Sequence, residues 1–245
     1  MLLRRSDTLP PYVTLKRSKR ARRLALRLDP KDRTFHLVVP AGMSLKRAQR
    51  FAEEHDSWMI DKLMELPEPV PFEDGSIIPI LGQNRRIHIF YDEDLRATST
   101  TLKYQELIVT TNKEDPASRI ERALKKIARK ELKTLAREKA ALIGKTVKTV
   151  SARDTKSRWG SCSSDGNLSF SWRLIFAPQV AFDYVVAHEV AHLKHLDHST
   201  AFWNVCRDLS DDFLEGEYWI REHGHELMRY GATSTFPHLK KITAA

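Results

Sequence analysis

The chain has 245 residues, enough for one large domain or two small ones, and its 41% hydrophobic and 30% charged residues are ordinary for a soluble globular protein. Its formal net charge is +9, and it has only two cysteines, Cys162 and Cys206, neither of them in a CxxC pair. These values exclude a disulfide framework and a cysteine-based zinc knuckle, and they lead us to expect a reducing, cytoplasmic location. No apolar stretch approaches the roughly 20 residues of a membrane span, and we see no apolar segment of a secretory signal at the start.

The positive charge is concentrated near the N-terminus. Residues 1–50 contain 14 Lys and Arg against 3 Asp and Glu, and the densest part is Lys16–Arg23. One interpretation is a phosphate-binding patch for DNA or RNA. The other, which the sequence alone favours, is a solvated basic strand or turn that protects a sheet edge from aggregation. The run itself holds no aromatic side chain, which argues against a platform for single-stranded nucleic acid.

The first predicted elements are strands followed by a helix. Residues 12–40 have a strand pattern, in which Arg22–Leu28 and Phe35–Val39 flank the turn Asp29–Asp32 and predict a hairpin. Ser44 is placed to cap a helix that runs to about Leu66.

A second β-rich stretch is predicted after the prolines at positions 67, 69 and 71, with strands over Ile77–Leu81, Arg86–Phe90 and Glu106–Val109. A long helix should then run from Asp115 to about Ile143, with most of its Lys and Arg side chains in solvent. We therefore expect a β-rich N-terminal region with one helix over residues 1–112 and a second domain over residues 113–245.

The last third predicts two strands and a buried helix. Lys148–Ala152 and Leu168–Trp172 have strand patterns, and the Gly/Ser-rich segment Arg158–Asn167 between them predicts a turn. Pro178 precedes a helix predicted over Val180–Leu196. The strand before this helix is a candidate edge for binding a peptide substrate by strand addition.

The most informative motif lies in that helix, at His188-Glu189-Val190-Ala191-His192. Residues four apart on a helix differ by about 40° around its axis, so His188 and His192 can bind one metal ion. Glu189 points about 100° from His188, from where its carboxylate can reach a water on that metal without being a ligand. This is the H-E-x-x-H pattern of zinc hydrolases. The helix is apolar nearly all round, and a metal gives buried histidines a reason to be there.

A third protein ligand is expected because catalytic zinc is bound by three side chains and keeps one open position. His198, ten residues after His188, has the metzincin spacing, although His195 stands where that pattern has glycine. His195 is the alternative if the helix runs on straight, but Ser199 or Thr200 is placed to cap a new helix over Ala201–Leu209. We therefore favour His198. Remote carboxylates also remain candidates, namely Glu215, Glu217 and Glu222.

Three segments together resemble the YgjP-like metallopeptidase family, which is related in motif to SprT-like proteases. They are RWGSCS at residues 158–163, LSFSWRLIFAP at residues 168–178, and HEVAHLKHLDHS at residues 188–199 with the following Phe202-Trp203. The resemblance extends over most of the chain. It implies an α+β fold with a minimal, gluzincin-like zincin core of helices packed on a small sheet, preceded by a β-rich region. It also implies zinc held by His188, His192 and His198, with Glu189 as general base.

The leading hypothesis is therefore a zinc-dependent peptidase acting on a peptide or protein. Its oxyanion would need a further donor, for which the candidates are Tyr218, His223, His225 and Arg173. A structural role is the more ordinary expectation for each of these, as it is for Trp159 and Trp203. A second hypothesis is a nucleic-acid-associated zinc protein whose basic N-terminal region binds DNA or RNA. A third is a metal hydrolase with a non-peptide substrate, and imidazole ligands also suit metals other than zinc.

Overall fold

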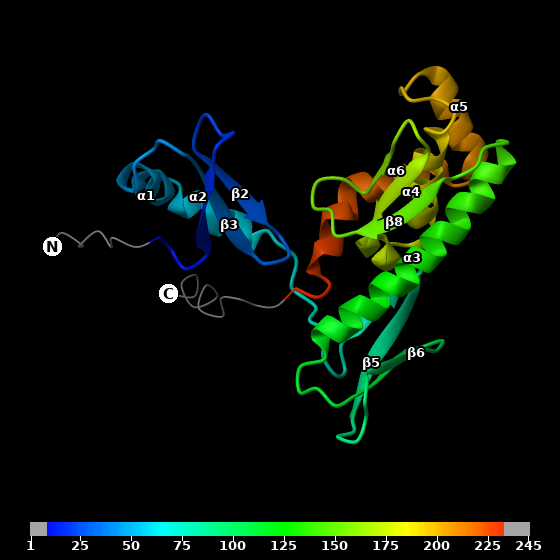
Figure 1. Cartoon of the computed structure of the whole chain (residues 1–245), viewed down its shortest axis with the longest axis horizontal. Coiled ribbons are helices and arrows are strands. Elements are labelled where there is room, and N and C mark those ends of the chain that lie inside the picture. Colours follow the sequence, from blue (N-terminus) through cyan, green and yellow to red (C-terminus); the bar gives the residue numbers. More distant parts are fainter. Residues whose placement is uncertain (1–8, 233–245) are drawn as a thin grey trace. The chain divides into compact units, whose positions relative to one another are not determined.

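The computed structural model describes residues 9–232, which form two compact units of mixed α/β structure (Figure 1). We call residues 9–69 the N-terminal unit and Val70–Gly231 the C-terminal unit. Helices and small sheets occur in both, in keeping with an α+β fold. Within residues 9–232, no helix is both long enough and apolar enough to cross a membrane.

A three-stranded sheet forms one layer of the N-terminal unit. It contains β1 (Val13–Ser18), β2 (Ala25–Asp29) and β3 (Thr34–Pro40) in the order β1-β3-β2. The antiparallel pairing of β2 with β3 confirms the predicted hairpin, and β1 pairs with β3 in parallel. Alternate residues of β3, including the fully buried Phe35 and Leu37, face the core of this unit.

Two helices cover this core where the sequence predicted one. They are α1 (Leu45–Glu54) and α2 (Asp56–Met64), with His55 between them at φ −110° and ψ 14°, outside the helical region. The prediction of one continuous helix to Leu66 was wrong because apolar periodicity does not register a single non-helical residue. Ser44 caps α1 as predicted, since its side chain accepts a hydrogen bond from the backbone N–H of Arg47.

The C-terminal unit begins with a four-stranded sheet and a long helix. The sheet has the order β4-β5-β7-β6 and comprises β4 (Ile77–Ile80), β5 (Gln83–Tyr91), β6 (Ser99–Leu102) and β7 (Glu106–Thr111). Its three predicted strands are present, and β6 was missed because its four residues include a single apolar side chain, that of Leu102, which is too few for a strand pattern. The helix is α3 (Ala117–Leu142), close to its predicted bounds.

The boundary between the units therefore lies near residue 70, not at the expected position between residues 112 and 113. The reason is packing: Ile87 and Val109 of the four-stranded sheet share one apolar core with Leu124 and Leu132 of α3. A change from strand-rich to helix-rich sequence marks a change of element, whereas a domain boundary requires that few contacts cross it.

A second small sheet and the remaining helices complete the C-terminal unit. The sheet has the order β8-β10-β9, so β10 is central and β9 is an edge. Its strands are β8 (Thr149–Arg153), β9 (Gly160–Cys162) and β10 (Asn167–Ser171). The helical segments are η1 (Trp172–Phe176), α4 (Gln179–Ala191), α5 (Thr200–Leu209), α6 (Phe213–His223) and η2 (Gly224–Arg229).

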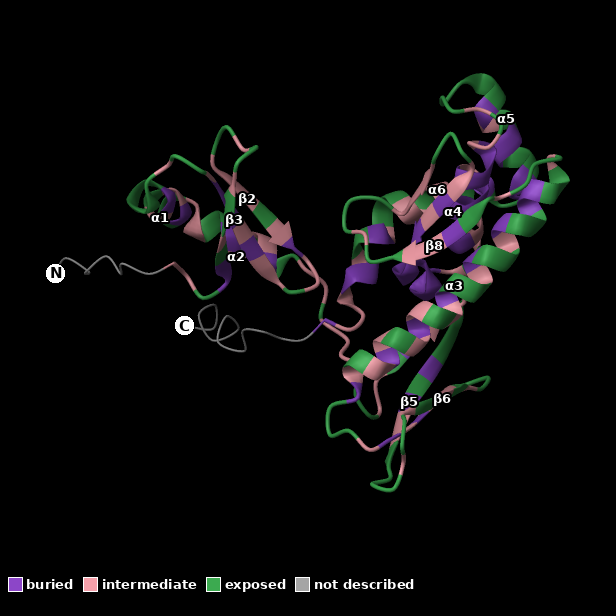
Figure 2. Ribbon diagram, in the orientation of Figure 1, coloured by how far each residue is buried: buried purple, intermediate pink, exposed green. Residues whose placement is uncertain are grey.

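Most residues of helix α4 are buried, and Figure 2 shows it mainly in the colours of buried and intermediate residues. Helix α6 crosses it closely at Gly216, where an added Cβ would come 2.5 Å from Cβ of Tyr184 and 2.6 Å from the carbonyl oxygen of Val180. From α3, the buried Lys139 ammonium lies 2.7 Å from the Asp183 carboxylate of α4 and also donates to the carbonyl of Leu209. These contacts hold α4 from several sides.

Candidate metal centre

Three imidazoles meet where α4 ends. His188 lies in the last turn of α4, His192 follows its final residue, and His198 lies in the segment that leads to α5. One ligand nitrogen from each of the three lies within 4.8 Å of the others. The Nε2 atoms of His188 and His198 are 3.3 Å apart. The structure thus brings together the three histidines that the sequence analysis selected.

His198 can reach the other two because α4 ends early. The predicted helix to Leu196 stops at Ala191, and the chain turns through hydrogen bonds such as that from the His195 N–H to the Ala191 carbonyl, 3.1 Å. In residues 9–232 the non-glycine positions with positive φ are Arg33 and Leu81, so the turn forms without a left-handed residue at His195. Ser199 then caps α5 by accepting from the Phe202 N–H at 3.5 Å, as predicted.

The aromatic rings of Phe202 and Trp203 pack against the imidazoles. The Phe202 ring, fully buried, has its centroid 5.0 Å from that of His188, 4.5 Å from that of His192 and 4.8 Å from that of His198. The Trp203 ring lies 5.7 Å from His188 and 5.6 Å from His198. Sequence reasoning did not assign Phe202 this role, although its place four residues after His198 was the available signal. Trp203 is a scaffold residue, as expected.

The hydrogen bonds of His192 leave the correct nitrogen available for a metal. Its Nδ1 lies 3.0 Å from the backbone carbonyl oxygen of His195, and because a carbonyl only accepts, Nδ1–H is the donor. Nε2 then keeps its lone pair, which is the usual arrangement of a metal-binding imidazole. His195 therefore supports the cluster through its backbone, and its side chain is not part of the cluster.

One distance within the cluster matches the spacing of two ligands on a tetrahedral zinc ion. With Zn–N distances of about 2.0–2.1 Å, two nitrogens bound to one tetrahedral ion lie about 3.3–3.4 Å apart. The 3.3 Å between Nε2 of His188 and Nε2 of His198 matches this spacing. A hydrogen bond between the two rings, with one nitrogen donating and the other accepting, has the same length in the absence of a metal.

Burial also keeps the imidazoles in the state that binds metal. Burial, followed by the proximity of His192 and His198, lowers the pKa of His188 to about 4. Burial likewise lowers the pKa of His192. Both rings are therefore neutral near pH 7, as ligation requires.

Glu189 lies on α4 beside the cluster and is buried, with 6% of its surface exposed. Burial raises the pKa of its carboxyl to about 7, against the opposing effect of the positive charge of Arg158. Its side chain lies directly against β9, because a Cβ built on Gly160 would come 2.4 Å from both Cγ and Oε1 of Glu189. Glu189 also contributes, after burial, to raising the pKa of Cys162 to about 11.

Gly160 was not singled out as functional by the sequence analysis, although the RWGSCS segment that contains it was. The absence of a side chain at this position lets strand β9 pass close to the carboxylate of Glu189. Strand β9 lies within the segment that was predicted as a turn. The prediction missed it because its three residues are too few and too small to show a strand pattern.

The other candidate residues lie outside the cluster. Within the described chain, the three-histidine group includes none of the carboxylates considered as third ligands, Glu215, Glu217 and Glu222. Arg173 is completely buried, with Nε 3.2 Å from Asp154 and Nη1 donating to the carbonyl of Tyr230 at 2.6 Å, which is a structural role.

The remaining oxyanion candidates belong to α6 and η2. Tyr218 is 55% exposed with the Arg221 guanidinium 5.4 Å from its ring, and His223 contacts Glu226 at 3.0 Å. His225 is exposed. None of these contacts identifies an oxyanion donor. Trp159 is partly buried and packs on the core beside Gly224, in line with the expected scaffold role.

Comparison with known proteins gives one match. The family described as "YgjP-like, metallopeptidase domain" matches residues 22–223, which include both units, the three histidines and Glu189. No curated protein and no solved structure gives a significant match to the chain.

The opposite pKa shifts of His188 and Glu189 predict how the stability of the metal-free protein depends on pH. With the pKa of His188 lowered from 6.5 to about 4, the unfolded state binds more protons between these values, so unfolding free energy rises with pH. With the pKa of Glu189 raised from 4.5 to about 7, the folded state binds more protons, so unfolding free energy falls with rising pH. The two contributions oppose each other between pH 4.5 and 6.5.

Glu189→Gln should remove the contribution of Glu189 to this pH dependence. The protein is treated with a chelator and unfolded in urea at a series of pH values. Between pH 4.5 and 6.5, the free energy of unfolding of the variant should rise by on the order of 2–3 kcal/mol more than that of the original chain. Glu215→Gln, at an exposed acid, is the matched control and should leave the profile unchanged. Parallel profiles for the original chain and Glu189→Gln would show that Glu189 is not protonated in this range.

Proposed function

Because the chain belongs to the YgjP-like metallopeptidase family, we propose that it is a zinc-dependent peptidase with its catalytic centre at the end of α4. The observation that carries this proposal is the convergence of three imidazole nitrogens within 4.8 Å, beside a buried carboxyl on the same helix. The substrate would be a peptide or protein.

In this proposal His188, His192 and His198 hold the metal. Three neutral imidazoles are the ligand set of several catalytic zinc sites and leave one position for the reaction. When bound, zinc lowers the pKa of water toward about 7 and polarises a carbonyl oxygen. The His195 carbonyl orients His192, and the rings of Phe202 and Trp203 limit the movement of the imidazoles.

Glu189 is the proposed general base. Its carboxylate would accept a proton from the attacking water and later deliver that proton to the leaving amine nitrogen. A pKa of about 7 suits both steps near neutral pH, because the same group must accept and release a proton. Its position against β9 keeps the carboxyl out of bulk water, which is the cause of the raised pKa.

Strand β9 is the proposed edge for the substrate. The strand immediately before α4 is β10, which pairs with β8 on one side and β9 on the other and so has no free edge. Strand β9 has β10 as its partner in the sheet and contacts Glu189 at Gly160. A peptide added to β9 would be aligned by backbone hydrogen bonds, which orient it with little dependence on sequence.

Metal content distinguishes the third ligand. His198→Ala should lose stoichiometric zinc after dialysis, because two imidazoles bind zinc less tightly than three. His195→Ala should keep it, because His195 contributes its backbone carbonyl. Elemental analysis of the purified variants beside the original chain measures both. Loss of zinc from His195→Ala with retention in His198→Ala would contradict the assignment.

Glu189→Gln tests the general base. The amide keeps the size of the side chain but cannot take the proton, so the rate of peptide hydrolysis should fall about 10²–10⁴-fold while zinc remains bound. A quenched-fluorescent peptide library and elemental analysis report the two quantities, with Glu215→Gln as the control. Undiminished hydrolysis would refute the role of Glu189.

Gly160→Ala tests the contact between β9 and Glu189. Since the new methyl group would lie 2.4 Å from Oε1, the carboxyl must shift, and displacements of about 1 Å can cost roughly 10²-fold in rate. We expect kcat to fall about 10²-fold with zinc content unchanged. Gly42→Ala makes the same chemical change where no atom lies within 4 Å, and should be silent. Equal activity of both variants would show that this contact does not position the base.

A further inference from the structure

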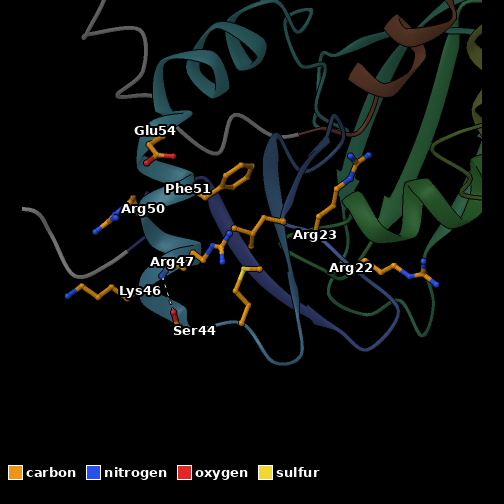
Figure 3. Close-up of a pocket in the computed structure, with 10 residues that line it drawn as sticks. Arg22, Arg23, Ser44, Lys46, Arg47, Arg50, Phe51 and Glu54 are labelled. Carbon is orange, nitrogen blue, oxygen red and sulfur yellow. Dashed lines mark hydrogen bonds between the residues drawn. The ribbon is translucent and has the colours of Figure 1, made fainter.

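A hollow of about 670 Å³ in the N-terminal unit is lined largely by cations (Figure 3). It lies between the connection from β1 to β2 and helix α1. Its lining residues are Arg22, Arg23, Leu24, Met43, Ser44, Lys46, Arg47, Arg50, Phe51 and Glu54. Figure 3 shows Arg47 and Phe51 extending from α1 toward the β1–β2 connection, with Lys46 and Arg50 on another side of the helix.

The positive charges of this hollow are not neutralised within the described part of the chain. None of its four arginines, nor Lys46, forms an ion pair with a carboxylate of residues 9–232, and Glu54 is the one acidic side chain in the lining. Helix α1 also begins here at Ser44, with no acidic residue in its first turn. The positive end of the helix dipole therefore adds to the field of the side chains.

The hollow also has apolar lining from Leu24, Met43 and Phe51. Phe51 is half-buried, and its ring centroid is 4.3 Å from that of His55. The basic run Lys16–Arg23 contains no aromatic residue, but the fold places Phe51, from 28 positions beyond Arg23, in the same hollow as the end of that run. Cations beside an aromatic ring are the composition of sites that bind single-stranded nucleic acids.

A second basic hollow lies on the opposite face of the sheet, because His36 and Val38 alternate along β3 with the core-facing Phe35, Leu37 and Val39. This hollow of about 300 Å³ is lined by Lys16, Ser18, Arg20, Ala21, Arg27, His36 and Val38. Arg20 and Ala21 immediately precede Arg22 and Arg23, so one loop contributes to both hollows.

We propose that the larger hollow binds a single-stranded nucleic acid, with its phosphates on the arginines and a base against Phe51. Arginine predominates over lysine in the larger hollow, and its planar guanidinium matches phosphate oxygens in bidentate contacts. The Asp and Glu side chains of an acidic peptide would pair with the charges, but they carry no flat ring to place on the apolar lining, whereas every nucleotide carries a base beside its phosphate. The second hypothesis of the sequence analysis thus becomes a binding site in addition to the proposed peptidase centre.

The test is fluorescence anisotropy of a labelled single-stranded oligothymidine with the full-length protein at increasing salt. Affinity should fall with salt, with a log–log slope of about −0.7 for each phosphate contacted. The triple variant Arg22→Gln, Arg23→Gln, Arg47→Gln should bind at least about 10-fold more weakly, and its slope should be smaller by roughly 2.

The matched control carries Arg129→Gln, Lys133→Gln and Arg137→Gln on the exposed side of α3, with the same change of net charge. It should keep both affinity and slope within about 2-fold. An equal loss of affinity in the control would show that net charge, not the hollow, binds the strand, and would overturn the proposal. Absence of salt-dependent binding by the original chain would overturn it as well.

Phe51→Leu tests the aromatic contact separately from charge. Because stacking on one ring contributes about 1–3 kcal/mol per base, affinity for the single strand should fall about 5-fold or more, with duplex binding unchanged. Competition identifies the ligand class: unlabelled single strand should displace the probe far better than duplex, polyglutamate or inorganic phosphate. Equal displacement by duplex or by polyglutamate would refute a single-strand site, and urea unfolding would verify that each variant is folded.

Discussion

Desolvation of α4 is the constraint on which the candidate metal centre depends. This helix is packed between α3, α6 and the sheet that contains β9, and most of its side chains are buried. Charged groups are disfavoured there, so the pKa of His188 falls to about 4 and that of Glu189 rises to about 7. The same physical cause therefore acts on both proposed roles: it keeps the imidazole of His188 neutral, and it lets the carboxyl of Glu189 change its protonation state near neutral pH.

The ends of secondary-structure elements complete the site. Helix α4 stops immediately before His192, which frees the backbone carbonyl of His195 to accept from His192 and turns the chain back so that His198 faces His188. A helix continued to residue 196 would have carried His195 on the face of His188 and removed both contacts. Strand β9 contributes in a comparable way, since the missing side chain of Gly160 provides the space that Glu189 occupies.

The features that could be predicted from the sequence depend on contacts between residues close together in the chain. Spacing along a helix predicts that His188 and His192 lie together because i, i+4 geometry is local, and the structure brings their imidazoles together. The selection of His198 rested on spacing and on a cap at Ser199, which is also local, and the structure brings this residue to the other two. Phe202, Gly160 and the boundary near residue 70 depend on contacts between distant segments, and no periodicity within a window reports those.

The function of the basic N-terminal run also could not be predicted from its sequence alone, because other parts of the surface come from distant segments. As a sequence, Lys16–Arg23 without an aromatic residue favours a solvated strand or turn, because its charges alone do not identify a binding surface. Folding adds what the run lacks: the N-terminus of α1, the apolar side chains of Leu24 and Met43, and the ring of Phe51. A charged segment becomes specific for a ligand only where the fold sets an uncharged surface of the right shape beside it. Here that surface comes from residues 20 or more positions downstream of the run, together with its immediate neighbour Leu24.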